Sequence, residues 1–198
     1  MASQSYRRTD FIYTPNYCEE NVYLLLQKLQ ADQLSGEFHV VFVSNSSSSV
    51  ALFAQAKGDP KSDHMIVWDY HVFLIQTAFG SHWVFDFDTV LDFPVSFGVY
   101  RKYGLRENAL LPDEFRRLYR VISGSLFLEH FASDRRHMKR PNGDWIACPP
   151  VYDCLRGAAA TDVHTLPYFL NMTLVTDGSN RSPYGTVLNE SLFFAQFA

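Results

Sequence analysis

The sequence predicts one α/β or α+β domain in which a mainly antiparallel sheet is flanked by helices. Two observations predict this class. Short β-branched and aromatic runs fill the middle of the chain, and segments with apolar residues at helical spacing lie before and after them. The length of 198 residues suits a single domain with its own core. We therefore expect one domain over residues 1–198, with an N-terminal arm over residues 1–16.

The first predicted element after the arm is a helix that begins near Cys18. Residues 18–31 carry Val22, Leu25, Leu26 and Leu29 at helical spacing, and two glutamates stand in the first turn. Strands are then expected over residues 38–45, 50–56, 66–78 and 82–90. Serine-rich and Gly-Asp-Pro segments predict loops before and after the second of these strands, and Phe-Gly-Ser predicts a hairpin between the last two.

The second half of the chain is predicted to be mainly helical. After Pro94 the helical segments are expected over residues 95–104, 112–121, 125–134 and 189–197. The segment 112–121 begins with a proline, which the first turn of a helix tolerates. A proline-rich loop is expected around residues 140–154.

Composition and charge exclude several classes of protein. The chain is 47% hydrophobic and only 19% charged, which excludes a disordered, collagenous or coiled-coil chain. A net charge of −4 provides no basic field for a nucleic acid, and no apolar run approaches the roughly 20 residues of a membrane span. We expect no signal peptide, and three cysteines, an odd number, fit reduced thiols in the cytosol.

Cys18 is the first candidate for chemistry, because it stands at the start of the predicted helix. Unpaired backbone N–H groups and the positive end of the helix dipole lower the pKa of a thiol in this position. Glu19 and Glu20 would oppose that effect if they faced the thiol. The alternative is that Cys18 is a small buried hydrophobic residue.

His71 and Asp86 are the second and third candidates. An imidazole inside the apolar run 66–78 needs a hydrogen-bond partner, so His71 is either a satisfied core residue or part of a site. In the next strand, Asp86 and Asp88 share one face, opposite an aromatic one. The predicted hairpin brings Asp86 within reach of His71, where a carboxylate would fix the tautomer of the ring. For Asp88 the alternative is an acid that pins a turn.

Cys18, His71 and Asp86 together supply a nucleophile, a base and a group that orients the base. Their order along the chain is similar to that of the transglutaminase-like and papain-like group. Cys148 and Cys154 lack the paired C-x-x-C spacing of a zinc site, so no metal is expected. No P-loop or dinucleotide motif occurs. His137 stands among basic residues, and two interpretations stay open for it: a loop that contacts a substrate or the backbone, and a solvated surface.

Several longer strings resemble the protein N-terminal glutamine amidohydrolase family. They are NYCEEN (16–21), VFVSN (41–45), VWDYHV (67–72), VFDFDTVLDFP (84–94), FRRLYRVI (115–122) and FASDRRHMKRPNGDW (131–145). The resemblance runs from about residue 16 to residue 152. The serine run within 46–64 departs from the family pattern, and little of 153–185 matches it.

The resemblance implies a function and a set of site residues. Enzymes of this family convert an N-terminal glutamine to glutamate, an early step in the N-degron pathway that ends with arginylation. The triad of the family corresponds to Cys18, His71 and Asp86 here. The resemblance also implies an α–β–α sandwich, a monomer without cofactor, and a cytoplasmic and nuclear location.

A free chain terminus as substrate requires a carboxylate near the thiol that reads the α-ammonium group. The sequence supplies four acids for this role, of which Glu20 and Asp88 are favoured over Glu19 and Asp69. Two aromatic residues, Trp68 and Tyr70, are candidates for the pocket wall, although core packing explains them equally well. Two alternatives stay open: a cysteine peptidase or transglutaminase-like enzyme, and a non-catalytic adaptor that binds protein N-termini.

Overall fold

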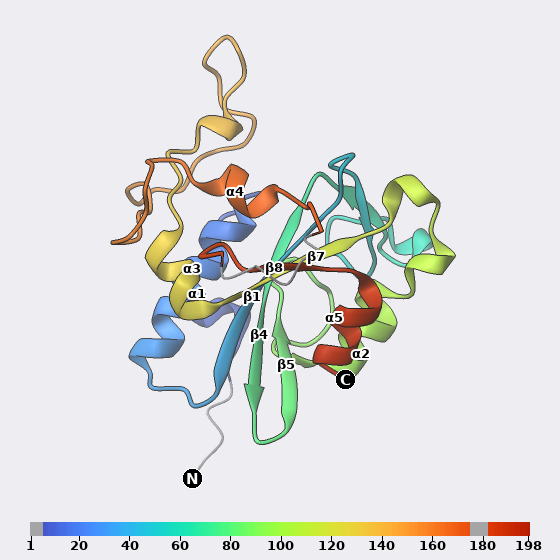
Figure 1. Cartoon of the computed structure of the whole chain (residues 1–198). Helices are drawn as coiled ribbons and strands as arrows, with labels where there is room; N and C mark the ends of the chain where they lie inside the picture. The colour runs from blue at the N-terminus through green and yellow to red at the C-terminus, as the bar shows by residue number, and fades with distance from the viewer. Residues whose placement is uncertain (1–5, 175–181) are drawn as a thin grey trace.

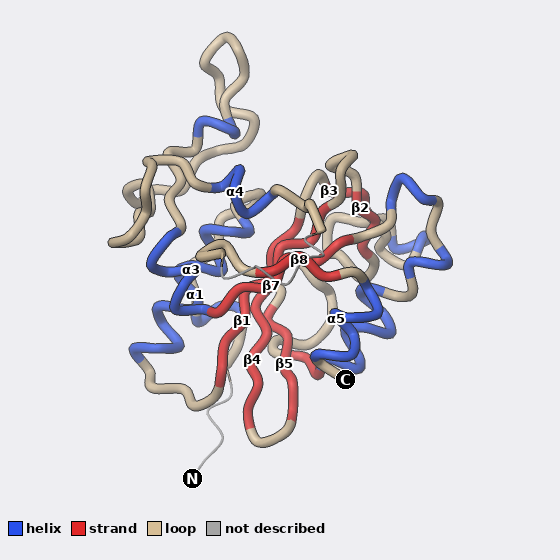
Figure 2. The backbone as a smooth tube through the Cα atoms, in the orientation of Figure 1, coloured by secondary structure: helices blue, strands red, loops and turns tan. Residues whose placement is uncertain are grey.

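A six-stranded antiparallel sheet forms the centre of the fold, with strands in the order β6-β5-β4-β1-β7-β8 (Figure 1). We describe it from a computed structural model, which describes residues 6–174 and 182–198. The strands are β1 (Glu37–Ser44), β4 (His71–Ala78), β5 (Ser81–Phe85), β6 (Val95–Ser96), β7 (Leu118–Ser123) and β8 (Thr186–Leu188). A second, two-stranded sheet pairs β2 (Val50–Leu52) with β3 (Ile66–Trp68) (Figure 2). The predicted α+β class with an antiparallel sheet is confirmed.

Helices cover both faces of the large sheet (Figure 1). One face carries α1 (Cys18–Ala31), α3 (Gly124–His130) and α4 (Leu166–Leu170), and the other carries α2 (Phe97–Tyr100) and α5 (Glu190–Gln196). Short 3-10 turns occupy Arg8–Asp10, Pro60–Ser62, Asn108–Leu110, Asp113–Phe115 and Arg136–Met138, and a π-helical turn occupies Arg101–Leu105. Within the described residues no helix is both long and apolar enough to cross a membrane.

Side chains along β1 point alternately to the two faces of the sheet, which explains how one sheet supports two cores. Val40 and Phe42 join the cluster under α1 and α3, whereas Val41 and Val43 join the cluster under α2 and α5. Successive side chains of a strand point to opposite faces, so a strand buried on both sides reads as a continuous apolar run. The predicted strand over 38–45 and the predicted helix over 18–31 are therefore confirmed.

One predicted helix is wrong. Residues 112–121 form a short turn, Asp113–Phe115, followed by β7, which pairs with β1 on one side and β8 on the other. Tyr119 and Val121 face the α5 cluster while Ile122 faces the α1 cluster, which is the alternation of a strand. Pairing on both edges outweighs the helical spacing of this segment.

Other predicted elements have different limits. The segment 66–78 breaks at Asp69, so that β3 and β4 belong to different sheets, and the predicted strand 82–90 ends at Phe85. The hairpin between β4 and β5 is confirmed, and its turn at Phe79 and Gly80 has positive φ at both residues, 52° and 73°.

The predictions nearer the chain ends have mixed outcomes. The helices predicted over 95–104, 125–134 and 189–197 are present as the shorter α2, α3 and α5. Of the predicted arm over residues 1–16, the first five residues lie outside the described part of the chain. The extent of the single predicted domain stays a prediction.

Candidate active site

A pocket of about 630 Å³ opens where the start of α1 meets the start of β4. Cys18 is the first residue of α1, His71 is the first residue of β4, and both line the pocket. In the described part of the chain no side chain caps the N-terminus of α1, so backbone N–H groups of its first turn have no side-chain partner there. The packing of α1 on β4 thus brings together two residues that are far apart in the sequence.

The Cys18 thiol lies in an acidic setting. Its Sγ atom donates a hydrogen bond to Glu19 Oε2 at 3.6 Å. Burial raises the pKa of Cys18 well above its usual value, the charges of Glu19 and Asp88 raise it further, and the backbone N–H of Val72 opposes them. The expected lowering of this pKa at the helix start is therefore outweighed by burial and by neighbouring carboxylates.

His71 and Asp86 form a buried pair. His71 Nε2 lies 2.8 Å from Asp86 Oδ1, and both side chains are almost fully buried. Burial alone would lower the pKa of His71, but the charge of Asp86 and the hydrogen bond to it raise the pKa above its usual value. The ring stacks on Trp68 with centroids 5.8 Å apart. With Nε2 bound to Asp86, Nδ1 is the nitrogen left for proton transfer at the pocket.

Asp86 is held as an ionised carboxylate by four donors. Oδ1 accepts from His71 and from the backbone N–H of Asp88 at 2.9 Å, and Oδ2 accepts from Gln55 Nε2 at 3.0 Å and from the Tyr100 hydroxyl at 2.8 Å. Burial would raise the pKa of Asp86, but His71 and these hydrogen bonds lower it below its usual value. The strand ends before Asp86, so the carboxylate comes from the loop after β5.

His71, Asp86 and Asp88 also place potential metal ligands within 4.8 Å of one another. Both oxygens of Asp86 already accept hydrogen bonds, and His71 Nε2 already donates one of them. A cation bound here would have to displace them. The bonding pattern is therefore that of an acid–base pair.

The predicted substrate-binding residues separate into two groups. Four of them line the pocket: Trp68, Asp69, Tyr70 and Asp88. Glu20 does not line it, because its carboxylate binds the Arg135 guanidinium at 2.8 Å and is buried there. The structure thus leaves Asp88 and Asp69 as the acids that face the pocket.

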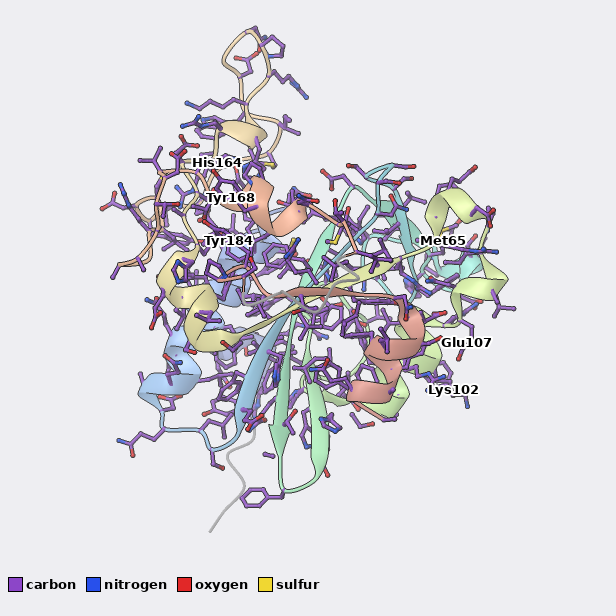
Figure 3. The ribbon with its side chains drawn as sticks, viewed as in Figure 1. Met65, Lys102, Glu107, His164, Tyr168 and Tyr184 are labelled. Atoms are coloured by element: carbon purple, nitrogen blue, oxygen red, sulfur yellow. The ribbon has the colours of Figure 1, made fainter. Side chains whose placement is uncertain are left out.

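Sequence reasoning missed several residues of this site. Gln55 and Tyr100, which bind Asp86, lie in segments with no motif of their own, so nothing in the sequence marks them. Of the two interpretations of His137, the solvated surface is wrong: the residue lines the pocket and stacks on His164 with centroids 5.4 Å apart. Figure 3 shows His164 on the segment that leads into α4, on the side of the molecule where the long loop after α3 projects.

Comparison with known proteins identifies a family for these residues. A family model described as N-terminal glutamine amidase matches residues 13–197, a range that contains Cys18, His71 and Asp86. A protein N-terminal glutamine amidohydrolase of Arabidopsis thaliana is 41% identical over 152 residues, which cover 73% of this chain and 68% of the relative. Proteins of the same name from Oryza sativa subsp. indica and Drosophila melanogaster are 35% and 37% identical, over 92% and 96% of this chain and 85% and 89% of their own.

Proposed function

The chain belongs to the N-terminal glutamine amidase family, and we propose that it hydrolyses the side-chain amide of glutamine at the N-terminus of a peptide or protein. The products would be an N-terminal glutamate and ammonia. The observation that carries the proposal is the His71–Asp86 pair at the same pocket as the thiol at the start of α1. These residues supply the base, the orienting group and the nucleophile that amide hydrolysis needs.

In the first half of the proposed reaction, Cys18 passes its proton to His71 Nδ1 and attacks the side-chain carbonyl carbon of glutamine. The raised pKa of His71 makes its ring a better acceptor for that proton. The imidazolium then protonates the amide nitrogen, the C–N bond breaks, and ammonia leaves a glutamyl thioester on Cys18.

In the second half, His71 takes a proton from water, and the hydroxide attacks the thioester carbon. The C–S bond breaks, glutamate leaves, and the thiolate recovers the proton from His71. Backbone N–H groups at the uncapped start of α1 are the proposed donors to the oxyanion in both halves. The proposed chemistry needs no cofactor.

Asp88 is the proposed ligand of the substrate α-ammonium group, with Asp69 as a second acid. Both line the pocket with Cys18, whereas Glu20 is neutralised by Arg135. The Tyr13 hydroxyl donates to Asp88 Oδ1 at 2.6 Å, which orients the carboxylate. Asp88→Asn should therefore raise KM for a free N-terminal glutamine more than it lowers kcat.

The resemblance also supports finer proposals. We propose a transglutaminase- or papain-like catalytic core, in which the cysteine begins a helix and the histidine begins a strand. We further propose that the product feeds the N-degron pathway, and that the protein acts as a monomer in the cytoplasm and nucleus. Sedimentation of the purified chain and fractionation of cells would test the last two points.

One assay tests the proposed reaction. Peptides that begin with glutamine, asparagine or acetyl-glutamine are incubated with wild type, Cys18→Ala and Cys148→Ala, and ammonia and peptide mass are followed. Cys148 is an exposed free thiol, so its variant is the matched control. We expect a gain of about 1 Da, from amide to acid, only for free N-terminal glutamine and only while Cys18 is present.

The other outcomes identify the competing functions. Chain cleavage or cross-linking would indicate a peptidase or a transglutaminase-like enzyme. Binding of free N-termini without a mass change would indicate an adaptor. Asparagine is one methylene shorter than glutamine, and burial of that methylene favours glutamine by only about 1–3 kcal/mol. The remaining selectivity must come from geometry, because the shorter amide does not reach Cys18.

A further inference from the structure

A second pair of titratable groups, Glu19 and His137, lies beside Cys18 and has no role in the mechanism above. The Glu19 side chain is fully buried. Its Oε2 atom accepts from the Tyr70 hydroxyl at 3.0 Å and from the Cys18 thiol at 3.6 Å. Its Oε1 atom has no hydrogen-bond partner among the described residues. A buried carboxylate oxygen in this state is costly, which points to a partner that must supply a proton or a charge.

His137 is the group placed to do so. Its Nε2 atom lies 3.5 Å from Glu19 Oε1, and within the described part of the chain both ring nitrogens are buried without a hydrogen bond. A small rotation of the ring would convert this contact into a charge-assisted hydrogen bond. The same carboxylate thus faces the thiol with one oxygen and an imidazole with the other.

The other charged groups around His137 have partners of their own, so His137 is the group that can supply a proton to Glu19. His164 stacks on the ring from the segment before α4, and its Nδ1 atom lies 3.4 Å from Asp134 Oδ1. Asp134 and Arg136, on the same turn as His137, bind each other. Burial lowers the pKa of His164, which disfavours the charged form of the second ring. Glu19 is therefore the carboxylate that responds to a proton on His137.

The charge of Glu19 has a direct consequence for the nucleophile. A carboxylate within about 4–6 Å of a thiol disfavours the thiolate. A proton on His137 would form an ion pair with Glu19 and cancel most of that effect. Without the proton, the buried charge of Glu19 acts on Cys18 in full.

We propose that His137 is a positioning residue for the nucleophile, which holds a proton against Glu19 Oε1 and thereby allows Cys18 to ionise. The inference rests on the proposed role of Cys18 as the nucleophile. It assigns Glu19 and His137 to a second acid–base pair that acts through the thiol and does not contact the substrate amide.

The test measures how the alkylation rate of Cys18 by iodoacetamide depends on pH. Mass spectrometry of the Cys18 peptide separates it from the exposed Cys148 and Cys154. The variants are His137→Gln, Glu19→Gln, the double variant, and His130→Gln as control. His130 also has a buried ring nitrogen that finds no hydrogen-bond partner among the described residues, but its ring packs against Tyr184.

We expect His137→Gln to move the alkylation midpoint up by about one pH unit and Glu19→Gln to move it down by a similar amount. On the Glu19→Gln background, His137→Gln should have no further effect, and His130→Gln should match wild type. The acidic limb of kcat/KM should follow the same order. Alkylation needs no turnover, so it reports on the pair even if the proposed amidase reaction is wrong.

Two results would overturn the proposal. One is a wild-type midpoint in His137→Gln, and the other is an equal shift from His137→Gln on both backgrounds. Thermal unfolding checks that the variants fold. If Glu19→Gln does not fold, Glu19→Asp withdraws the carboxylate by one methylene and should weaken the effect of His137→Gln; an undiminished effect would also contradict the proposal.

Discussion

Asp86 determines which nitrogen of His71 can take part in proton transfer. Because Oδ1 accepts from Nε2 at 2.8 Å, the neutral ring carries its proton on Nε2 and presents Nδ1 to the pocket. Gln55 and Tyr100 hold the other oxygen of Asp86, so the carboxylate cannot turn away. The tautomer of the base is therefore fixed by residues that never reach the substrate.

Replacement of Asp86 by asparagine should remove this control. In one orientation the new amide would point its NH₂ group at Nε2, which favours the tautomer with the proton on Nδ1. In the other orientation the NH₂ group would face the donors of Gln55 and Tyr100 and lose both hydrogen bonds. We expect kcat for ammonia release to fall by on the order of 10³- to 10⁴-fold with little change in KM. Asp63→Asn is the control, because Asp63 is an exposed acid paired with Arg106. A kcat close to wild type in Asp86→Asn would contradict the assignment.

The same pair predicts how stability depends on pH. The pKa of Asp86 is lowered by folding, so its contribution is present above about pH 4 and is lost as pH falls through the folded value. The pKa of His71 is raised, so its contribution is present below about pH 6.5 and is lost as pH rises through the folded value. The pair therefore stabilises the fold most between these limits.

Urea unfolding across this pH range checks the window. The difference in the free energy of unfolding between wild type and Asp86→Asn should be largest from about pH 4 to pH 6.5 and should shrink on both sides. A difference that does not change with pH would show that Asp86 acts through packing rather than through its charge.

At the scale of elements, the periodicity of apolar residues predicted two kinds of segment correctly. These are helices that bury one face and strands whose side chains alternate between two buried faces. The helix 18–31 and the strand 38–45 obey those patterns closely, and their predicted limits are nearly correct. The hairpin after β4 was predictable because Gly80 accepts the positive φ that the turn requires. The hairpin also predicted that Asp86 lies near His71, and the two side chains are 2.8 Å apart. The packing of α1 on β4, which brings Cys18 to the same pocket, was not predicted from the sequence.

What escaped prediction depends on contacts between distant segments. Residues 112–121 have helical spacing, but β7 forms because β1 and β8 supply hydrogen bonds on both edges. The guanidinium of Arg117 is fully buried and donates to the carbonyl oxygens of Ala51 and Arg106. A lone sequence does not reveal such partners. For the same reason it placed Glu20 in the site, since Arg135 lies far along the chain.

The C-terminal helix should stabilise the fold without lining the catalytic pocket, although its core cluster also contains Tyr100, which binds Asp86. Phe193 of α5 is fully buried and stacks on Tyr119 with centroids 4.0 Å apart, and its core cluster lies on the face away from α1. Phe193→Ala should cost about 3–5 kcal/mol of unfolding free energy while the folded fraction keeps its kcat. Leu192→Ala, on the exposed side of the same helix, should stay within about 0.5 kcal/mol. A loss of kcat without a loss of stability would link α5 to the site.

At the scale of the whole molecule, the pocket is assembled from both ends of the chain. Its lining includes Cys18 near the N-terminus and His71 from the sheet. From the C-terminal part of the chain it includes Leu166, the first residue of α4, and His164, which lies just before that helix (Figure 3). The described part of the arm runs beside the loop after β5. The Tyr13 hydroxyl binds Asp88, and the Tyr13 ring stacks on Phe87 with centroids 5.6 Å apart. The arm is therefore part of the support of the acidic loop.

Arg8 connects the arm to the loop after β5, so its replacement tests whether the arm supports that loop. Its Nη2 atom donates to the carbonyl oxygens of Thr89 and Leu91, each at 2.7 Å, and its guanidinium lies over the Phe93 ring at 5.3 Å. Arg8→Ala should cost about 1.5–3 kcal/mol of unfolding free energy, because hydrogen bonds from a charged donor are lost.

The loosened loop should also raise KM for N-terminal glutamine peptides, because Asp88 comes directly before Thr89 in that loop. Arg7→Ala is the matched control, since the neighbouring arginine is exposed and its side chain makes no hydrogen bond or ion pair within the described residues. Steady-state kinetics and thermal unfolding of the two variants decide the matter. If Arg8→Ala lowers stability but leaves KM unchanged, the arm supports the fold alone and Asp88 keeps its position without it.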